Sequence, residues 1–383
     1  MSAPLPTFFD RSNAYNPNYR PRENSMLALA TQYRRDTGIK PYTADALRGA
    51  IVNMAIIDGQ NDFCFPPIFD TTGEQTDGGT LYVGGRSGTG AMDDNARLAE
   101  FIYRNMGLIT YITCTLDSHY AFMIFFATAW VTKDGKPLSP HTLIVLAKDG
   151  KTLNNIGLDG TVLNEDVGPN PVAATFMGAQ VGIVGVNEMK RYYRHYVEML
   201  AKGGLYTLYL WPLHTQIGTW GHNVAGVIRE AHLFHGMVRN VQPLFQLKGT
   251  LPLSERYGVF AEEVDIDHTG RQIAQVNTGF VTQLAQSDAT IFAGQAASHC
   301  VKSSIGQFLR ELAKKDPELA KRIYIMKDCM SSVAVPDGKG GFLADFTPQA
   351  EQALDEFARA GMNVVESTTP LRDWPGVMSK IAA

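Results

Sequence analysis

The sequence predicts an α/β fold with a doubly wound, mainly parallel six-stranded sheet and helices on both faces. Continuous apolar runs recur along the chain, and such runs are typical of strands that are buried on both faces. Segments with apolar residues at helical spacing lie between these runs. Strands that alternate with helices favour parallel pairing, because a helix has room to return the chain to the start of the next strand.

The first part of the chain stands outside this alternation. Residues 1–48 are polar and rich in Pro, Asn and Arg. We expect an extended N-terminal arm with one short helix, which either wraps a neighbouring subunit or remains a loose tail. Residues 49–383 are expected to form one domain.

The core elements follow from the two patterns. In chain order we expect strands at 51–58, 108–117, 205–212, 241–248, 288–294 and 322–328, and helices at 92–106, 223–236, 301–314 and 348–360. The stretch 133–204 is rich in turn residues and then helical, so we interpret it as an insertion between the second and third strands. A shorter insertion, rich in Gly and Thr, is expected at about 66–80.

Composition narrows the class of protein. The net charge is −4 and there is no basic run, which argues against a nucleic acid or an anionic membrane as partner. The longest apolar run, 120–131, is too short to span a bilayer, and the N-terminus has no secretory signal. The four cysteines form no CxxC pair and are expected to be free thiols. A cytoplasmic enzyme with a small-molecule substrate is the expectation.

Reactive or metal-binding residues follow five of the predicted strands. In an open parallel sheet, ligands bind beyond the carboxyl ends of the strands. The residues at these ends are Asp58, Asp117 with His119, His214, Lys248 and Cys300. The rim of a sheet is commonly polar, but this selection of side chains favours a functional site.

Cys300 is the candidate nucleophile. It follows small residues and is expected at the start of a helix, where free N–H groups and the helix dipole would lower the pKa of the thiol and could bind an oxyanion. The alternative is a buried structural cysteine, which we expect for Cys64, Cys114 and Cys329.

Asp58 and Lys248 are expected to pair, because each would otherwise be a buried, unpaired charge. They could form a purely structural pair. Beside a thiol, Asp58 could accept its proton and Lys248 could hold the anionic groups in place. His299 is a second candidate base, ranked below Asp58 because neighbours at a helix start usually point apart.

A metal site is predicted at two adjacent strand ends. Asp117 and His119 are two residues apart and face the same way on an extended strand. With His214 they form one carboxylate and two imidazoles, a set that suits a divalent metal, most commonly Zn, with Fe or Mn as alternatives. The remaining histidines outside the Cys300 region are expected to be structural or exposed.

Several short motifs resemble those of the isochorismatase-like cysteine hydrolases, and among them the nicotinamidase-like branch. "IIDGQNDF" (56–63) resembles the opening motif of that family, and "LDSHYAFMIFFA" its metal motif. "LWPLHTQIGTWG" is similar to the Trp-Pro-x-His stretch of nicotinamidases, "LKG" to the lysine motif, and "ASHCVKSS" to the nucleophile motif. The order of the motifs is also that of the family.

The resemblance implies a role for each candidate residue. It implies a catalytic triad of Asp58, Lys248 and Cys300, a metal site of Asp117, His119 and His214, an oxyanion hole of the Ala296 and Cys300 N–H groups, and substrate walls of Phe63 and Trp211. Ordinary core packing is the alternative for the last two. A non-proline cis peptide is implied near Gln295–Ala296, and so is a homo-oligomer.

The implied function is that of a metal-containing cysteine amidohydrolase, which cleaves a small carboxamide through a thioester. The sequence departs from the family at "DSHY", where Asp-Trp-His-Pro is usual, and at Thr215, where the family has Cys. These departures weaken the expectation of nicotinamide itself, and a related amide would use the same residues. The alternative is a non-catalytic ligand-binding or scaffold protein that retains the fold.

Overall fold

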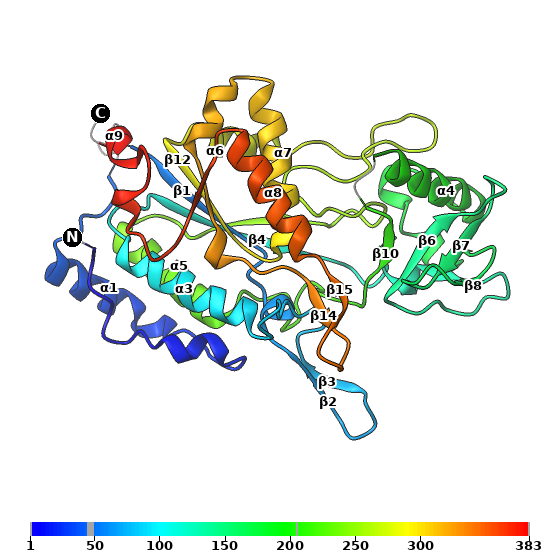
Figure 1. Cartoon of the computed structure of the whole chain (residues 1–383), viewed down its shortest axis with the longest axis horizontal. Coiled ribbons are helices and arrows are strands. Elements are labelled where there is room, and N and C mark those ends of the chain that lie inside the picture. Colours follow the sequence, from blue (N-terminus) through cyan, green and yellow to red (C-terminus); the bar gives the residue numbers. More distant parts are fainter. Residues whose placement is uncertain (1, 44–49, 204–205, 382–383) are drawn as a thin grey trace.

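The core of the molecule is a parallel six-stranded sheet (Figure 1). The computed structural model describes residues 2–43, 50–203 and 206–381. The strand order is β11 (Leu244–Lys248), β4 (Tyr111–Asp117), β1 (Val52–Ile57), β12 (Ala289–Gly294), β13 (Ile323–Met326) and β16 (Asn363–Val365). This arrangement confirms the predicted doubly wound α/β fold.

Helices cover both faces of this sheet (Figure 1). One face packs on α3 (Gly90–Arg104) and α5 (Gly226–Arg239), and the other packs on α6 (Thr278–Ala285), α7 (Lys302–Ala313) and α8 (Thr347–Arg359). The central strand β1 is buried along its whole length, and its side chains alternate between the two resulting cores. A strand of this kind needs apolar side chains on both faces, which explains the uninterrupted run "VNMAII".

The prediction of a third core strand at 205–212 was wrong. Strand β10 (Leu208–Leu210) lies outside the six-stranded sheet and pairs antiparallel with β6 (Thr142–Leu146). The sixth position of the core sheet belongs to β16, which pairs with β13. Both strands have three residues, and at that length an apolar run cannot indicate which sheet it joins.

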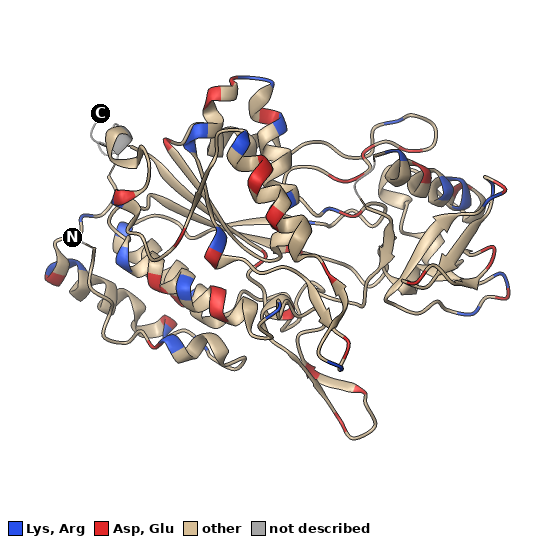
Figure 2. Ribbon diagram, in the orientation of Figure 1, with Lys and Arg blue, Asp and Glu red and all other residues tan. Residues whose placement is uncertain are grey.

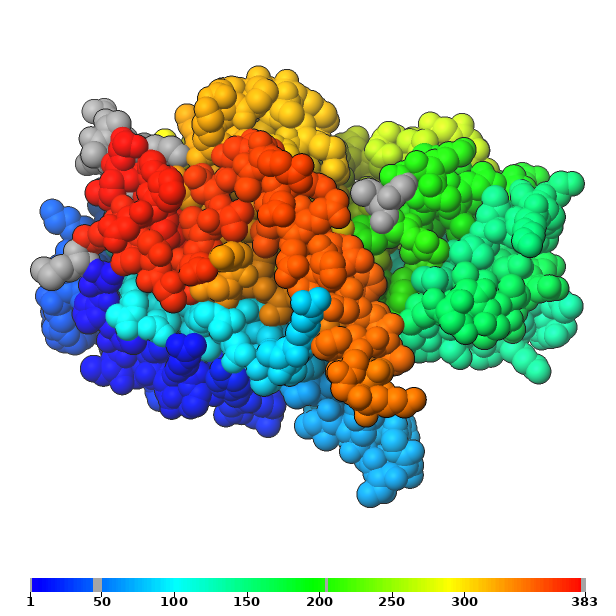
Figure 3. Space-filling view, viewed as in Figure 1, coloured from blue at the N-terminus to red at the C-terminus, as the bar shows by residue number. Residues whose placement is uncertain are grey.

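The region around the predicted insertion forms a separate lobe at one end of the molecule (Figures 1 and 3). Its sheet has the order β10-β6-β7-β8, with β7 at Leu153–Ile156 and β8 at Val162–Asn164. A two-stranded ladder joins β5 (Trp130–Val131) to β9 (Gly168–Pro169), and α4 (Val186–Gly203) packs beside them. The predicted boundaries at residues 48 and 204 lie outside the described residues.

The N-terminal segment packs on the chain's own core rather than extending away from it. It contains a 3₁₀ helix, η1 (Arg11–Tyr15), and the 15-residue α1 (Glu23–Thr37), which lies along α5. Met26 and Ala30 of α1 are fully buried in the core that α3 and α5 share. The buried face of α1, which includes Met26, Ala30 and Tyr33, thus packs within the chain, and the polar average composition of the segment did not reveal this face.

The remaining elements are short. They are the helices α2 (Asn61–Cys64) and α9 (Val377–Ile381), and the hairpins β2 (Pro67–Phe69) with β3 (Gln75–Gly78) and β14 (Ala334–Pro336) with β15 (Phe342–Asp345). Short helices of one or two turns lie at Ala127–Ala129, Ala173–Thr175, Ala179–Val181, Ala297–Val301, Pro317–Arg322, Lys327–Cys329 and Leu371–Asp373. Within the part of the chain that the structure describes, no helix combines the length and apolar character needed to cross a membrane.

Candidate active site

Three neighbouring strands deliver the candidate residues to one edge of the sheet. Lys248 ends β11 and is the direct register partner of Asp117, which ends β4. Asp58 follows the last residue of β1, the next strand across. Because the strands are parallel, their carboxyl ends meet at the same edge, and side chains far apart in sequence converge there.

The acid, the amine and the thiol lie together. Lys248 Nζ is 3.0 Å from Asp58 Oδ2 and 3.8 Å from Cys300 Sγ. Thr115 donates a hydrogen bond of 2.5 Å to Asp58 Oδ1. The other carboxylate oxygen, Oδ2, faces the Lys248 ammonium and accepts no hydrogen bond. Asp58 and Lys248 are almost completely buried, whereas Cys300 is partly exposed.

The expectation of a lowered thiol pKa was wrong. Cys300 lies in the one-turn helix Ala297–Val301 that leads into α7, as expected. However, burial raises the pKa of the thiol well above its ordinary value, and the charge of Lys248 only partly opposes this effect. The negative charges of Asp58 and Asp117 raise the thiol pKa further. The resting group is therefore a neutral thiol that needs a base.

Asp58 has the properties of such a base. Burial raises its pKa above the ordinary carboxyl value, while Lys248 opposes the shift and the nearby Asp117 adds to it. A carboxylate with a raised pKa is a better proton acceptor than an exposed one. For Lys248, burial lowers the pKa, but the charges of Asp117 and Asp58 outweigh burial and raise it well above the ordinary value, so the ammonium stays charged.

Asp117, His119 and His214 form the candidate metal centre. Their ligand atoms all lie within 4.8 Å of one another. Asp117 Oδ2 is 2.8 Å from His119 Nε2 and 3.5 Å from His214 Nε2. The same carboxylate contacts Lys248 through its other oxygen, Oδ1, at 2.7 Å.

Backbone carbonyls orient both imidazoles. His119 Nδ1 is 2.9 Å from the Gly249 carbonyl, and His214 Nδ1 is 2.8 Å from the Pro212 carbonyl. A ring nitrogen that donates to a carbonyl leaves the opposite nitrogen unprotonated and directed at the site. The three side chains thus offer two Nε2 lone pairs and one carboxylate oxygen, a donor set that fits a divalent metal such as Zn.

A glycine makes room for this arrangement. Gly249 has φ +76, and a Cβ there would lie 2.6 Å from His119 Cε1 and 3.0 Å from Asp117 Oδ1. Only glycine satisfies both the backbone conformation and the close approach. This contact explains why a glycine follows Lys248 in "LKG".

A small, mainly apolar pocket joins the thiol to the metal centre. Phe63 and Trp211 both line it, together with Ala296 and Cys300, and the ring of Phe63 lies 5.7 Å from that of His214. The Gln295–Ala296 peptide is cis, as the family resemblance implied. The predicted substrate walls and the predicted oxyanion-hole residues therefore border one cavity.

His299 is a wall of this pocket rather than a base. Burial lowers its pKa to about 4, and its ring packs against Tyr206, Tyr257 and Trp211. Its Nδ1 is 2.9 Å from Ser298 Oγ. It is therefore neutral near pH 7 and contributes an aromatic surface.

Among the lining residues that the sequence analysis missed, Glu255 and Tyr257 carry ionisable groups. Burial raises the pKa of Glu255 well above the ordinary carboxyl value, the charge of Asp117 adds to this shift, and the charge of Lys248 opposes it. Tyr257 Oη accepts a hydrogen bond of 3.2 Å from Trp211 Nε1. Both residues lie in the long segment after β11, and no periodicity or strand end marks them in the sequence.

Two buried amides hold the site in place and were also missed. Gln60 accepts a hydrogen bond from the Asp117 N–H (2.7 Å) and donates one to the Asp117 carbonyl (2.8 Å). Gln295 donates to Asp94 Oδ2 at 2.9 Å, which ties the loop before Cys300 to α3. Their position beside strand ends was the available signal.

Solved nicotinamidases resemble this structure. The nicotinamidase/pyrazinamidase of Acinetobacter baumanii is 16% identical over 84% of this chain and 98% of its own, with a TM-score of 0.43. The yeast nicotinamidase bound to the inhibitor nicotinaldehyde is 16% identical over 82% and 100% of the two chains, with a TM-score of 0.45. The pyrazinamidase of Pyrococcus horikoshii in complex with zinc is 13% identical over 82% and 98%, with a TM-score of 0.39.

These matches come from the group of proteins that the sequence motifs resemble. No family model and no curated protein matches the chain. Because the TM-scores are low, the fold rests here on the observed strand order and the site on the measured distances.

Proposed function

We propose that the chain is a metal-containing cysteine amidohydrolase, similar to nicotinamidases, that hydrolyses a small carboxamide to the acid and ammonia. The observation that supports this proposal is the convergence of three side chains. Lys248 Nζ lies 3.0 Å from Asp58 Oδ2 and 3.8 Å from Cys300 Sγ, next to the Asp117–His119–His214 cluster. A protein that only binds a ligand has no use for a thiol beside a buried base.

The first half of the reaction forms a thioester. Asp58 accepts the proton of the Cys300 thiol as the sulfur attacks the amide carbon, and the carbonyl oxygen becomes an oxyanion. The N–H groups of Ala296 and Cys300 are the proposed donors to this oxyanion. Asp58 then returns the proton to the leaving nitrogen, and ammonia departs as the C–N bond breaks.

The second half releases the acid. Asp58 accepts a proton from a water molecule, which attacks the thioester carbon, and the C–S bond breaks as the sulfur is protonated again. Lys248 remains charged throughout and holds Asp58 in position. A bound divalent metal would supply a Lewis acid that holds and polarises the substrate, and Phe63 and Trp211 would enclose the rest of the molecule.

Loss of the thiol tests the proposal. Ammonia release should be screened over nicotinamide, pyrazinamide, carbamoyl compounds and maleamate-type acids, first with the unmodified protein. Cys300→Ala should abolish release from whichever substrate is active and leave the metal content unchanged. Cys329→Ala, which removes a buried cysteine of another region, is the matched control. Full activity of Cys300→Ala would refute the proposal.

The second candidate is a ligand-binding or scaffold protein that keeps the hydrolase fold. The large lobe beside the site favours it, because such a lobe could serve as an interaction surface. Mass spectrometry of the protein quenched during turnover distinguishes the two functions. An acyl group on Cys300 supports the hydrolase, whereas binding of the amide without acylation or ammonia release supports the scaffold.

Three further properties belong to the same proposal. We expect the small-molecule amide to be the main partner, with no nucleic acid or membrane involved, and we expect a homo-oligomer in a cytoplasmic setting. Sedimentation velocity and fractionation of cells that express the protein test the last two.

A further inference from the structure

We propose that the lobe at the end of the molecule carries a second binding site, for a small molecule with two or three phosphate groups. The lobe contains a cavity of about 530 Å³ between α4, the β5–β9 ladder and the turn between β6 and β7. This volume is in the range of cavities that hold cofactor-sized ligands. The site is separate from the pocket at Cys300, and the proposal does not depend on the amidase activity.

The charge of the lining points to a polyanion. The lining contains one acidic residue, Asp166, and five cations: Lys133, Lys151, Lys190, Arg191 and Arg194. The chain as a whole has a net charge of −4, so this local excess of positive charge runs against the average. A concave site with one sign of charge concentrates its field on a ligand of the opposite sign.

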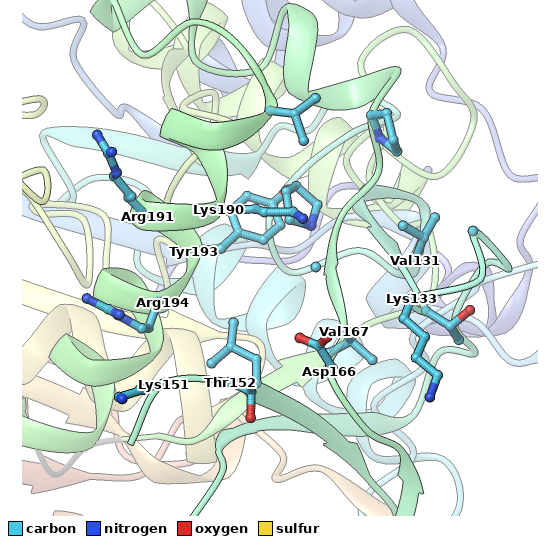
Figure 4. Close-up of a pocket in the computed structure, with 17 residues that line it drawn as sticks. Val131, Lys133, Lys151, Thr152, Asp166, Val167, Lys190, Arg191, Tyr193 and Arg194 are labelled. Atoms are coloured by element: carbon cyan, nitrogen blue, oxygen red, sulfur yellow. The ribbon is translucent and has the colours of Figure 1, made fainter. Parts of the chain in front are cut away.

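The cations come from α4 and from two segments that face it, the chain after β5 and the turn between β6 and β7. Figure 4 shows Lys190 extending across the middle and Lys133 on the side opposite α4, while Arg191 and Arg194 lie on α4 with their side chains directed outward. The aliphatic stem of Lys190 lies beside Gly168 of β9. A Cβ built on Gly168 would be 3.9 Å from Lys190 Cε, an ordinary van der Waals contact. Lys133 follows β5, which pairs with β9 through Val131 and Gly168.

The two arginines are already held by their own helix, and the lysines are the groups left for a ligand. Arg191 pairs with Glu188 at 2.6 Å and Arg194 with Glu198 at 3.2 Å, each within α4. Among the described residues, Lys133, Lys151 and Lys190 form no ion pair within 4.0 Å. Figure 2 shows acidic and basic residues interspersed along α4. Exposed pairs of this kind are weak, so the arginines can also turn to a ligand.

The chemistry of the wall narrows the ligand class. Guanidinium groups match phosphate oxygens in pairs, and ammonium groups act as point charges on the same oxygens. Apolar side chains, among them Leu153, Val167 and Pro169, form the remaining wall and suit a less polar portion of the ligand. A nucleoside diphosphate or triphosphate combines both parts, whereas inorganic pyrophosphate offers the charge alone.

Calorimetric titration of the full chain tests this inference with four probes: ATP, pyrophosphate, adenosine and a hexaglutamate peptide. We expect ATP and pyrophosphate to bind, ATP at least about tenfold more tightly because it also covers the apolar wall, and adenosine not to bind at millimolar concentration. Tighter binding of the acidic peptide than of ATP would overturn the assignment to phosphate, and so would a lack of binding by both phosphate probes.

Variants separate this site from general attraction of anions. Lys190→Ala should weaken ATP binding by about fivefold or more, and Asp166→Asn, which removes the one carboxylate, should strengthen it. Lys202→Ala is the matched control, because Lys202 is exposed on α4 outside the cavity lining. Equal weakening by Lys190→Ala and Lys202→Ala, or weakening by Asp166→Asn, would show that the cavity is not the site.

Discussion

The ammonium of Lys248 lies 3.0 Å from the carboxylate of Asp58, and both side chains are buried beneath the candidate nucleophile. The same ammonium contacts Asp117 Oδ1 at 2.7 Å, so one cation serves two buried acids that belong to two different parts of the site. The proposed triad and the proposed metal centre are thus joined through Lys248, and a change in one should be felt in the other.

Removal of the Lys248 charge should destabilise the fold as well as abolish activity. Lys248→Met leaves Asp58 and Asp117 as buried carboxylates without their cation, which costs about 3–5 kcal/mol. Arg229→Met is the control, because Arg229 pairs with Glu23 on the surface at 2.9 Å and such a pair contributes less than about 1 kcal/mol. Urea unfolding measures both. Equal losses in the two variants would contradict the role of Lys248.

The reactivity of Cys300 should increase when Asp58 loses its charge. The Asp58 carboxylate raises the pKa of the thiol, so Asp58→Asn should lower that pKa and speed alkylation by iodoacetamide at pH 8, although hydrolysis is lost with the base. Lys248→Met should slow alkylation, because the charge of Lys248 lowers the thiol pKa. Glu230→Gln, at a buried acid on α5, should leave the rate unchanged. An unchanged rate in Asp58→Asn would mean that Asp58 does not act on the thiol, whereas a slower rate would mean that loss of the base outweighs the lowered thiol pKa.

Metal affinity should depend on the glycine after Lys248. Gly249→Ala places a Cβ against His119 and should reduce zinc affinity by about tenfold or more, because misplaced ligands typically cost that much. Gly270→Ala is matched for backbone strain, since Gly270 has φ +85 but nothing within 4 Å of an added Cβ. Gly270→Ala should lose about 1–2 kcal/mol of stability from backbone strain alone. Gly249→Ala should lose more because of the added clash with His119, and only Gly249→Ala should lose zinc in competition with a chelator. Equal zinc retention would contradict the proposed centre.

Stability should fall in mild acid because two histidines on α5 are buried without charge. Burial lowers the pKa of His232 to about 4 and that of His235 to about 3. In the unfolded chain a histidine titrates near pH 6.5. Below that pH the unfolded state binds more protons than the folded state, so the free energy of unfolding decreases. The contribution of the two neutral histidines to the free energy of unfolding is complete above pH 6.5. It is lost as the pH falls from 6.5 toward the folded-state pKa values of about 4 for His232 and about 3 for His235.

This loss can be measured and assigned. Between pH 7 and pH 5 each histidine should account for about 2 kcal/mol of lost stability. His235 Nε2 donates a hydrogen bond of 3.0 Å to the Ile109 carbonyl, so His235→Gln keeps a donor there but removes the titration. Thermal unfolding of His235→Gln should show a flatter pH dependence than that of the unmodified chain. An unchanged slope would mean that other groups cause the acid sensitivity.

The sequence was sufficient for the parallel α/β fold, for all core strands except β16, and for the convergence of the candidate residues, because these follow from apolar runs and their ends. Asp58, Asp117 and Lys248 each end or follow an apolar run, and parallel strands place such ends side by side whatever the loops do. The same reasoning failed for the run at 205–212, since β10 has the composition of a core strand but pairs with β6 outside the core.

Two features were beyond the reach of sequence patterns for physical reasons. The pKa of Cys300 depends on how much of the thiol is covered, and the cover comes from residues distant in sequence. Glu255 and Tyr257 reach the pocket because the segment after β11 packs against the lobe. Neither the cover of the Cys300 thiol nor the position of Glu255 and Tyr257 produces a repeat or a spacing that sequence analysis could detect.

Strand β10 joins the two halves of the molecule, since it completes the lobe's sheet through β6 and leads within four residues to His214. Trp211 lies between β10 and His214, and its backbone N–H donates a hydrogen bond of 2.8 Å to the Phe125 carbonyl. The ring of Phe125 packs on His119. The lobe is therefore not a detachable module. An engineer who trims residues 133–204 to obtain a minimal catalyst would unpair the strand that leads to the candidate ligand His214, so truncation should yield an apo-like protein rather than a smaller enzyme.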